Sequence, residues 1–545
     1  MLRHTFAVAV LVMPLVTLGQ TTLPADQPLK GVLIPGMGNH HHPASTSSAE
    51  AQKFFDQGLD LVFGFNHDEA MRSFSRAAEI DPQFAMAHWG LALALGPNYN
   101  IDVDPPREKA AYEEIQKALQ LAAGASLPER DYINAMARRY SNDPKADLKK
   151  LAQDYSDAMR ELSRKYPDDL DAATFYAESR MLLRPWKLWA HDGKPAEGTL
   201  EILATLESVL KREPDHLGAN HYYIHAIEGS PYPQRGLESA ARLPNLAPAA
   251  GHLVHMPAHI YSRIGDHSAA AGSNALAAAA DEAYIKSRND GGIYPMMYYA
   301  HNLHFLAYSN AMLGRYADSK KAADRLYDHI LPHIAMMPMV EGFAVAPMLV
   351  QVKFHKWDDI LKLSDPGKEK PLLQFTWHFA RAMALASTRK PMAAQEEWDA
   401  MNALAKTFPA DSMYGMLNPT ADIVALSDNF AAAKVAEANG DRKSAITLLT
   451  KAAEQEDALI YDEPPAWWLH VRESLGALLL RNGNPAEAEA VFRKELEWNP
   501  RSGRALFGLS QALTAQGKTY DASWIQREFE AAWKDADTKL TINDL

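Results

Sequence analysis

The sequence contains no cysteine in its 545 residues. This absence excludes disulfide bonds, thiol nucleophiles, zinc ribbons and cysteine-ligated metal clusters. Long hydrophobic runs are also missing, because no stretch after the first 19 residues reaches the roughly 18 consecutive apolar residues of a membrane-spanning helix. We therefore expect a mature chain without a membrane span, in which any metal ion would be held by histidine or carboxylate groups.

Positively charged residues are fewer than negatively charged ones. Lys and Arg total 55 against 68 Asp and Glu, which gives a formal net charge of −13, and no long basic run occurs. Binding to nucleic acid requires a basic patch that neutralises phosphates, so nucleic acid is not expected as a partner. The chain also lacks a G-x-S-x-G nucleophile motif and any Gly-Lys pair with the spacing of a phosphate-binding loop.

The first residues have the pattern of an export signal. Arg3 precedes an apolar stretch of 13 residues, and the small residues Thr17 and Gly19 suit a cut before Gln20. An uncleaved anchor is the alternative, although so short a stretch cannot cross roughly 30 Å of hydrocarbon. We predict a signal peptide at 1–19, a periplasmic or secreted protein, and a flexible linker at 20–48. The histidine run 40–42 is expected to be solvated linker, with loose metal binding as the alternative.

From residue 49 onward the chain repeats a unit of about 34 residues that is typical of tetratricopeptide helix–turn–helix repeats. The matching units, two strong and two weaker, are 51–84, 469–502, 426–459 and 503–536. Small residues such as Gly58 allow the two helices of a unit to pack closely, and a proline ends the second helix. We predict an all-α fold, a right-handed tetratricopeptide-repeat superhelix (an α-solenoid) of roughly 10–12 repeats over residues 49–545.

Three segments carry a family resemblance. They are FDQGLDLVFGFNHDEAMRSFSRAAEIDPQFAMAHWGLALALGPNYN at 55–100, NHYYIHAIE at 220–228 and GHLVHMPAHIYSRIGD at 251–266. Each resembles exported bacterial tetratricopeptide-repeat proteins similar to the tetratricopeptide repeat protein 38-like family, and the resemblance covers most of the mature chain. It implies the repeat fold but brings no established activity with it.

Histidine is concentrated in the middle of the chain, where nine of the 21 histidines lie between residues 216 and 304. The histidine-rich repeat segment itself is 217–304. Together with one glutamate they form three short runs at helical spacing. The eight candidate metal ligands are His221, His225 and Glu228, then His252, His255 and His259, then His301 and His304. Residues three or four apart share a helix face with Cβ atoms about 5–6 Å apart, so two imidazoles at this spacing can bind one ion.

Turn glycines and a proline, independently of the histidines, fix the repeat frames in this segment. Pro248, Gly265 and Gly314 place first helices that begin at 217, 251 and 300. In these frames every candidate ligand falls on a position that lines the concave surface of a tetratricopeptide superhelix. We therefore expect neighbouring helices to direct the three runs into one groove.

Metal binding is the favoured interpretation of the histidine runs, and two alternatives stay open. The histidines could recognise a bound peptide or small ligand, or they could form structural polar packing. Copper, zinc and iron all suit imidazole ligands, so the sequence leaves the transition metal unidentified. Two ions with three histidines each would resemble a dioxygen-handling dicopper centre, whereas Glu228 could be a ligand or the base of a hydrolytic site.

Two functions of different class fit these features. One is an exported scaffold that binds a protein or peptide in its concave groove and carries a histidine-rich transition-metal site. The other is a metalloenzyme, oxidative or hydrolytic, that acts on a small-molecule substrate. The loop around Trp186 and Trp189 is expected to pack on the scaffold, and the stretch 97–100 has no assigned role.

Overall fold

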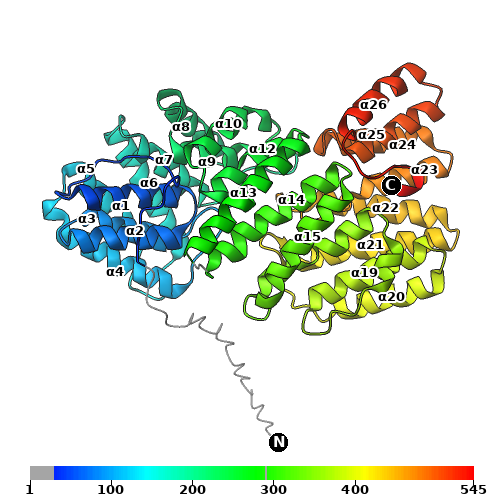
Figure 1. The fold of residues 1–545 in the computed structure, drawn as a ribbon, viewed down its shortest axis with the longest axis horizontal. Helices are drawn as coiled ribbons and strands as arrows, with labels where there is room; N and C mark the ends of the chain where they lie inside the picture. Colours follow the sequence, from blue (N-terminus) through cyan, green and yellow to red (C-terminus); the bar gives the residue numbers. More distant parts are fainter. Residues whose placement is uncertain (1–29, 289–290) are drawn as a thin grey trace, which may run out of the picture.

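The computed structural model describes residues 30–288 and 291–545, so the predicted signal peptide and residues 20–29 lie outside the described residues. The described chain consists almost wholly of helices that follow one another along an elongated body (Figure 1). Strands in this part of the chain are limited to a small antiparallel hairpin of β1 (Met413–Tyr414) and β2 (Asn418–Pro419). The predicted all-α tetratricopeptide-type superhelix is confirmed.

Each repeat unit is a pair of helices in mutual contact, and the described chain contains twelve such pairs. The pairs are α1 (Ala49–Phe63) with α2 (His67–Ile80), α3 (Ala85–Leu95) with α4 (Pro105–Leu121), α5 (Leu127–Met136) with α6 (Leu148–Lys165), α7 (Leu170–Met181) with α8 (Thr199–Arg212), α9 (Leu217–Ile227) with α10 (Leu237–Leu246), α11 (Gly251–His255) and α12 (Pro257–Arg263) with α13 (His267–Arg288), α14 (Ala300–Met312) with α15 (Tyr316–Ile330), α17 (Ala346–Lys353) with α18 (Trp357–Lys362), α19 (Pro371–Ser387) with α20 (Pro391–Ala405), α21 (Thr420–Ala438) with α22 (Arg442–Asp457), α23 (Val471–Arg481) with α24 (Pro485–Trp498), and α25 (Gly503–Ala515) with α26 (Thr519–Ala532).

Short helical turns complete the described chain between and after these pairs. They are η1 (Ala122–Gly124), η2 (Pro233–Gly236), the π-helical turn η3 (Pro295–Tyr299), η4 (Leu331–His333), η5 (Pro338–Val340), α16 (Glu341–Ala344) and η6 (Ile542–Asp544). None of the helices in residues 30–288 and 291–545 combines the length and the hydrophobicity that crossing a membrane would require.

Close packing between helices depends on glycines that face a phenylalanine. A Cβ atom at Gly58 would lie 2.4 Å from the Phe74 ring, and one at Gly90 would lie 2.5 Å from the same ring. The C-terminal repeats use the same arrangement around Phe492. Because a side chain at either glycine would overlap the ring, these positions let α1, α2 and α3 approach one another as the repeat pattern requires.

Residues 30–48, here called the N-terminal segment, are not the flexible linker that the sequence predicted. Met37 is buried, and the Ile34 backbone N–H donates to Gln57 Oε1 of α1 at 2.6 Å. His40 Nε2 lies 2.9 Å from Asp171 Oδ1, and His42 Nδ1 lies 2.7 Å from Asp171 Oδ2. The prediction failed because the histidine run pairs with a buried carboxylate of α7, which the composition of the segment does not reveal.

The cluster around Asp171 consists of three histidines whose ring nitrogens face one buried carboxylate. His216 Nε2 also lies 3.2 Å from Asp171 Oδ1, while His216 Nδ1 accepts the Ala219 N–H at 3.3 Å. Because Nδ1 of His216 is an acceptor, the proton of the neutral ring is on Nε2, and this nitrogen faces the carboxylate as a donor. The geometry therefore favours ion pairing that attaches the N-terminal segment to α7 and α9 over metal binding at this cluster.

This cluster makes part of the folding stability depend on pH. Burial by itself lowers the pKa of His40, but the hydrogen bond and charge of Asp171 raise that pKa to about 9. A histidine with a raised folded-state pKa stabilises the fold fully below about pH 6.5 and loses this contribution as the pH rises through about 9. We expect Asp171→Asn to cost up to about 3 kcal/mol at pH 6 and much less above pH 9.

Thermal unfolding of the wild type and the variant at pH 6 and above pH 9 measures this difference. Exposed Asp215 lies near the same helix pair, and Asp215→Asn provides the control. An equal loss of stability at both pH values would contradict the charge pairing between Asp171 and the histidines.

Candidate metal centre

Three consecutive first helices carry the histidines. They are α9, the α11–α12 pair and α14, which begin at Leu217, Gly251 and Ala300. Pro257 has no backbone N–H, so the helix is interrupted between α11 and α12. The π-helical turn η3 precedes α14, and such turns occur often at functional sites. These irregularities set the directions in which His255, His259 and His301 leave their helices.

Six of the eight candidates form two groups of three histidines. The first trio is His221, His225 and His252, and the second trio is His255, His259 and His301. Within each trio the candidate ligand nitrogens lie within 4.8 Å of one another. Glu228 and His304 belong to neither trio.

The imidazoles of each trio converge through their Nε2 atoms. His221 Nε2 lies 3.1 Å from His252 Nε2. His255 Nε2 lies 2.8 Å from His259 Nε2 and 3.1 Å from His301 Nε2. Nitrogens that share one ion at about 2.0–2.1 Å stand roughly 3 Å apart, so these separations match a common ligand sphere.

Protein acceptors occupy the opposite nitrogen of four of these rings at 2.5 to 2.8 Å. The Nδ1 pairs are His221 with the Phe63 carbonyl, His225 with Glu228 Oε1, His255 with Asn274 Oδ1, and His259 with Glu228 Oε2. An acceptor at Nδ1 fixes the proton there and leaves the Nε2 lone pair directed at the trio, as in metal sites. His225 Nε2 has no hydrogen-bond partner among the described residues, although it is buried.

Burial and mutual proximity keep most of these histidines neutral. Burial lowers the pKa of His221, His252 and His255 well below the ordinary value, and neighbouring imidazoles lower it further. The pKa of His301 is lowered for the same two reasons. Neutral imidazole is the form that binds metal ions, so these four histidines are already in that form at neutral pH. His259 differs, because Glu228 raises its pKa against the effect of burial.

Glu228 lies between the two trios and orients one ring of each. Both of its carboxylate oxygens accept Nδ1–H groups, from His225 and from His259. Burial alone would raise the pKa of Glu228, but His259 and His225 hold it at about 2. A buried carboxylate with both oxygens engaged is suited to orienting ligands, and it is poorly placed to act as the ligand or base that the sequence suggested.

His304 takes a different position from the other predicted ligands. Its ring packs against Phe343 and Trp468, with centroid distances of 5.2 and 4.9 Å. Burial lowers the pKa of His304 to about 3. His304 therefore contributes a neutral polar ring beside the second trio, outside its ligand sphere.

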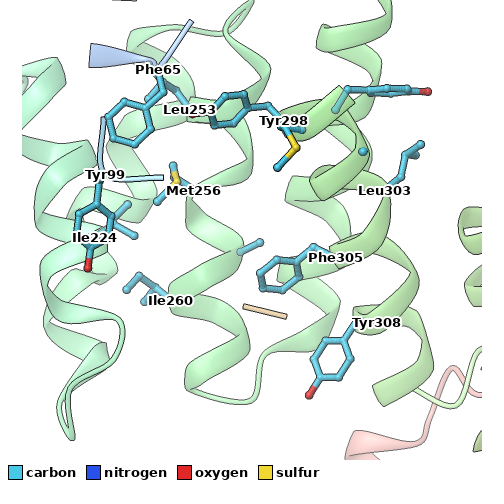
Figure 2. Close-up of a cluster of buried hydrophobic side chains, with 14 of the residues drawn as sticks. Phe65, Tyr99, Ile224, Leu253, Met256, Ile260, Tyr298, Leu303, Phe305 and Tyr308 are labelled. Carbon is cyan, nitrogen blue, oxygen red and sulfur yellow. The ribbon is translucent and has the colours of Figure 1, made fainter. Parts of the chain in front are cut away.

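The two trios adjoin each other and are enclosed by apolar side chains. The rings of His225 and His259 have centroids 5.6 Å apart, and those of His252 and His255 are 5.8 Å apart. Phe65 packs on His221 at 4.4 Å. Figure 2 shows the surrounding apolar groups, with Phe65, Tyr99 and Ile224 at one side of the cluster, and with Met256, Ile260 and Phe305 between neighbouring helices. The predicted concave groove is therefore filled at the histidines and leaves no room there for a peptide.

A cavity of about 930 Å³, partly open to solvent, adjoins the second trio. We call it the trio cavity. Its lining residues are Asn100, Ile101, Trp186, His259, Met297, Tyr298, His301, His304, Met339, Gly342, Phe343, Tyr414, Gly415, Met416, Leu417, Asp462, Glu463, Pro464 and Ala466. Its mainly apolar and aromatic lining with a few polar groups is typical of a site for a small molecule.

Several lining residues were not identified from the sequence. Burial raises the pKa of Asp462 and that of Glu463 to about 7, which makes both carboxyls candidate acids or bases. Asp462 and Glu463 precede two prolines in a loop between repeat units. The prolines predict a loop at this point, but nothing else in the local sequence indicates a site. Trp186 and Trp189 both pack on the core of the scaffold, as expected. Trp186 also lines the cavity, and Trp189 donates its Nε1–H to the Ala226 carbonyl at 2.8 Å.

No protein-family model and no curated protein matches the chain. Among solved structures, the human IFIT1 dimer with m7Gppp-AAAA is 13% identical over 90% of this chain and 91% of that chain, with a TM-score of 0.35. Yeast Tom70 is 10% identical over 89% and 93%, with a TM-score of 0.28. The P58(IPK) TPR domain is 11% identical over 86% and 99%, with a TM-score of 0.22. Likenesses this distant carry no argument about function, and it is the succession of helix pairs that shows the tetratricopeptide-type fold.

Proposed function

We propose that this protein is an exported metalloenzyme whose two histidine trios bind a pair of copper ions that react with dioxygen and a small molecule. The observation that carries the proposal is the convergence of six imidazoles as two adjoining trios, in which five rings are buried and His301 is partly exposed. The N-terminal export pattern and the resemblance to exported bacterial repeat proteins support a periplasmic or secreted location.

Copper fits the ligand set better than zinc or iron. Each trio offers three neutral nitrogens, and Glu228 is held behind the rings instead of among the ligand atoms. Non-haem iron oxygenases use two histidines and a carboxylate, which neither trio offers. Three histidines suit catalytic zinc as well as copper, so the binding affinity separates these two metals. Copper is also the divalent metal of this series that nitrogen ligands bind most tightly. Two reduced copper ions would supply one electron each to dioxygen, and the small molecule would return both electrons to the ions by being oxidised.

Catalysis is favoured over a scaffold role by the surroundings of the second trio. His259 and His301 line the trio cavity, so an ion held there would lie beside a space for a small substrate. The aromatic rings that cover the first trio exclude water and leave this cavity as the approach to the site. A peptide bound along the histidines would have to displace those rings.

Oxygen uptake tests the proposal. Protein freed of metal, reloaded with copper and desalted should consume dioxygen when given a small uncharged reductant such as tetramethyl-p-phenylenediamine. Protein reloaded with zinc should give only the background rate, because zinc does not change oxidation state. Equal rates with both metals, or no rate with bound copper, would contradict the oxidative function.

A further inference from the structure

The trio cavity has buried polar atoms that the protein leaves without hydrogen bonds. Asn100 Oδ1, Trp186 Nε1 and Glu463 Oε2 are each buried, and none has a hydrogen-bond partner among the described residues. All three residues line the trio cavity. Buried polar atoms are nearly always paired, because an atom left without a partner destabilises the fold. Three orphans around one cavity point to a ligand that satisfies them.

The orphaned atoms specify the hydrogen-bonding character of that ligand. Trp186 Nε1 is a donor, whereas Asn100 Oδ1 and Glu463 Oε2 are acceptors. A hydroxyl group both accepts and donates a hydrogen bond, so it can pair with the indole and with one acceptor together. An ammonium or amine group can pair with the remaining acceptor.

The walls of the trio cavity specify its shape and charge. Tyr298, Phe343 and Tyr414 supply aromatic rings, and Met297 and Met416 add polarisable side chains. Such walls suit a flat apolar ring, because aromatic groups stack and thioethers contact ring edges. Among the described residues that line the cavity there is no Lys or Arg, while Asp462 and Glu463 provide two carboxyls. A negatively charged ligand would meet these two carboxyls, and Arg263, whose charge acts on Glu463, lies outside the lining of the trio cavity.

Trp186 is held in place at the cost of backbone strain. Its φ of +59° lies in the left-handed region, which a residue with a side chain rarely adopts. The ring of Tyr99 stacks on the indole at 5.4 Å, and the ring of His225 meets it at 5.7 Å. Strain of this kind persists where the surroundings fix a side chain for a purpose. Here it presents the unpaired indole N–H beside the first trio.

We propose that the trio cavity binds an aromatic molecule that carries a hydroxyl group and no negative charge, with preference for a cationic amine at its other end. The hydroxyl pairs with Trp186 and Asn100, and the amine pairs with Glu463. The role of this molecule as a substrate rests on the proposed function, whereas its binding depends on the cavity alone.

Binding of three matched phenols to the metal-free protein, measured by calorimetry, tests the proposal. Tyramine is cationic, 4-ethylphenol is neutral and 3-(4-hydroxyphenyl)propionate is anionic, while the ring and chain are nearly the same. We expect tyramine to bind about 10-fold more tightly than 4-ethylphenol, and the anion at least about 10-fold more weakly, since one charge-assisted hydrogen bond is worth about 1.5–3 kcal/mol.

Two variants assign the contacts, and a third is the control. Glu463→Gln should bring tyramine and 4-ethylphenol to within about 3-fold of each other, and Asn100→Leu should weaken all three phenols about 10-fold. Glu454→Gln, at an exposed position of α22, should change nothing. Tightest binding by the anion, or no binding by any of the three, would overturn the proposal even if the protein held copper and consumed oxygen. If the three phenols bound in the expected order but the protein held no metal, the ligand proposal would be supported and the proposed function would be wrong.

Discussion

Replacement of His255 by alanine is expected to lower bound copper from about two equivalents to about one, and to reduce oxygen uptake at least about 100-fold. His255 is the central ligand of the second trio, because its Nε2 lies 2.8 Å from His259 Nε2 and 3.1 Å from His301 Nε2. Without it only two imidazoles remain, and the ion beside the trio cavity loses its site. Metal analysis and an oxygen electrode measure the two effects.

His304→Ala is the matched control for this prediction. His304 lies on the same helix as His301 and lines the same cavity, but it belongs to neither trio. The variant should keep both copper equivalents, although its rate can change because the cavity wall changes. Circular dichroism should show wild-type helicity for both variants. Full copper content in His255→Ala, or loss of copper in His304→Ala, would show that the trios are assigned to the wrong histidines.

Glu228→Gln is expected to weaken both copper ions about 10- to 100-fold, although the residue is not placed as a ligand. The carboxylate accepts Nδ1–H from His225 of the first trio and from His259 of the second. A glutamine side chain can accept at its oxygen only, so its NH₂ group faces one Nδ1–H and turns that ring away. Competition with a copper chelator measures both affinities.

Asn274→Ala provides the comparison, because Asn274 Oδ1 pairs with His255 Nδ1 at 2.6 Å and with no ring of the first trio. It should weaken one copper ion and leave the other at its wild-type affinity. If Glu228→Gln and Asn274→Ala both weakened a single ion, Glu228 would not connect the trios. If Glu228→Gln left both affinities unchanged, the orienting role would be wrong.

The positions of the histidine-bearing helices followed from local sequence. A proline and two glycines set the frames, and α9, α11 and α14 begin at the residues that those frames gave. Helical spacing then brought His221 and His225, or His255 and His259, to one face. The division into two trios did not follow, because it depends on the break at Pro257 and on the turn η3. The break at Pro257 and the turn η3 leave the repeat pattern of about 34 residues unchanged, so that pattern does not predict them.

The residues that orient the histidines and line the trio cavity come from distant parts of the chain. The Phe63 carbonyl is 158 residues from His221 in sequence, and Glu463 belongs to a loop between the last repeat units. The fold brings these residues from distant repeats to the histidine-bearing helices in the middle of the chain. No local sequence pattern predicts such contacts between distant repeats. The order of the N-terminal segment was not predicted for the same reason, because its histidines contact Asp171 only in the folded chain.

The most direct test of the central claim is the copper content of the mature protein. The chain should be purified without a metal-binding tag, reloaded with copper, desalted and measured by plasma mass spectrometry against protein concentration. Two trios predict about two copper ions per chain, and about one in His255→Ala. Fewer than about half an equivalent in the wild type, after copper and after zinc or iron in parallel, would contradict the account and leave the six histidines as buried polar packing.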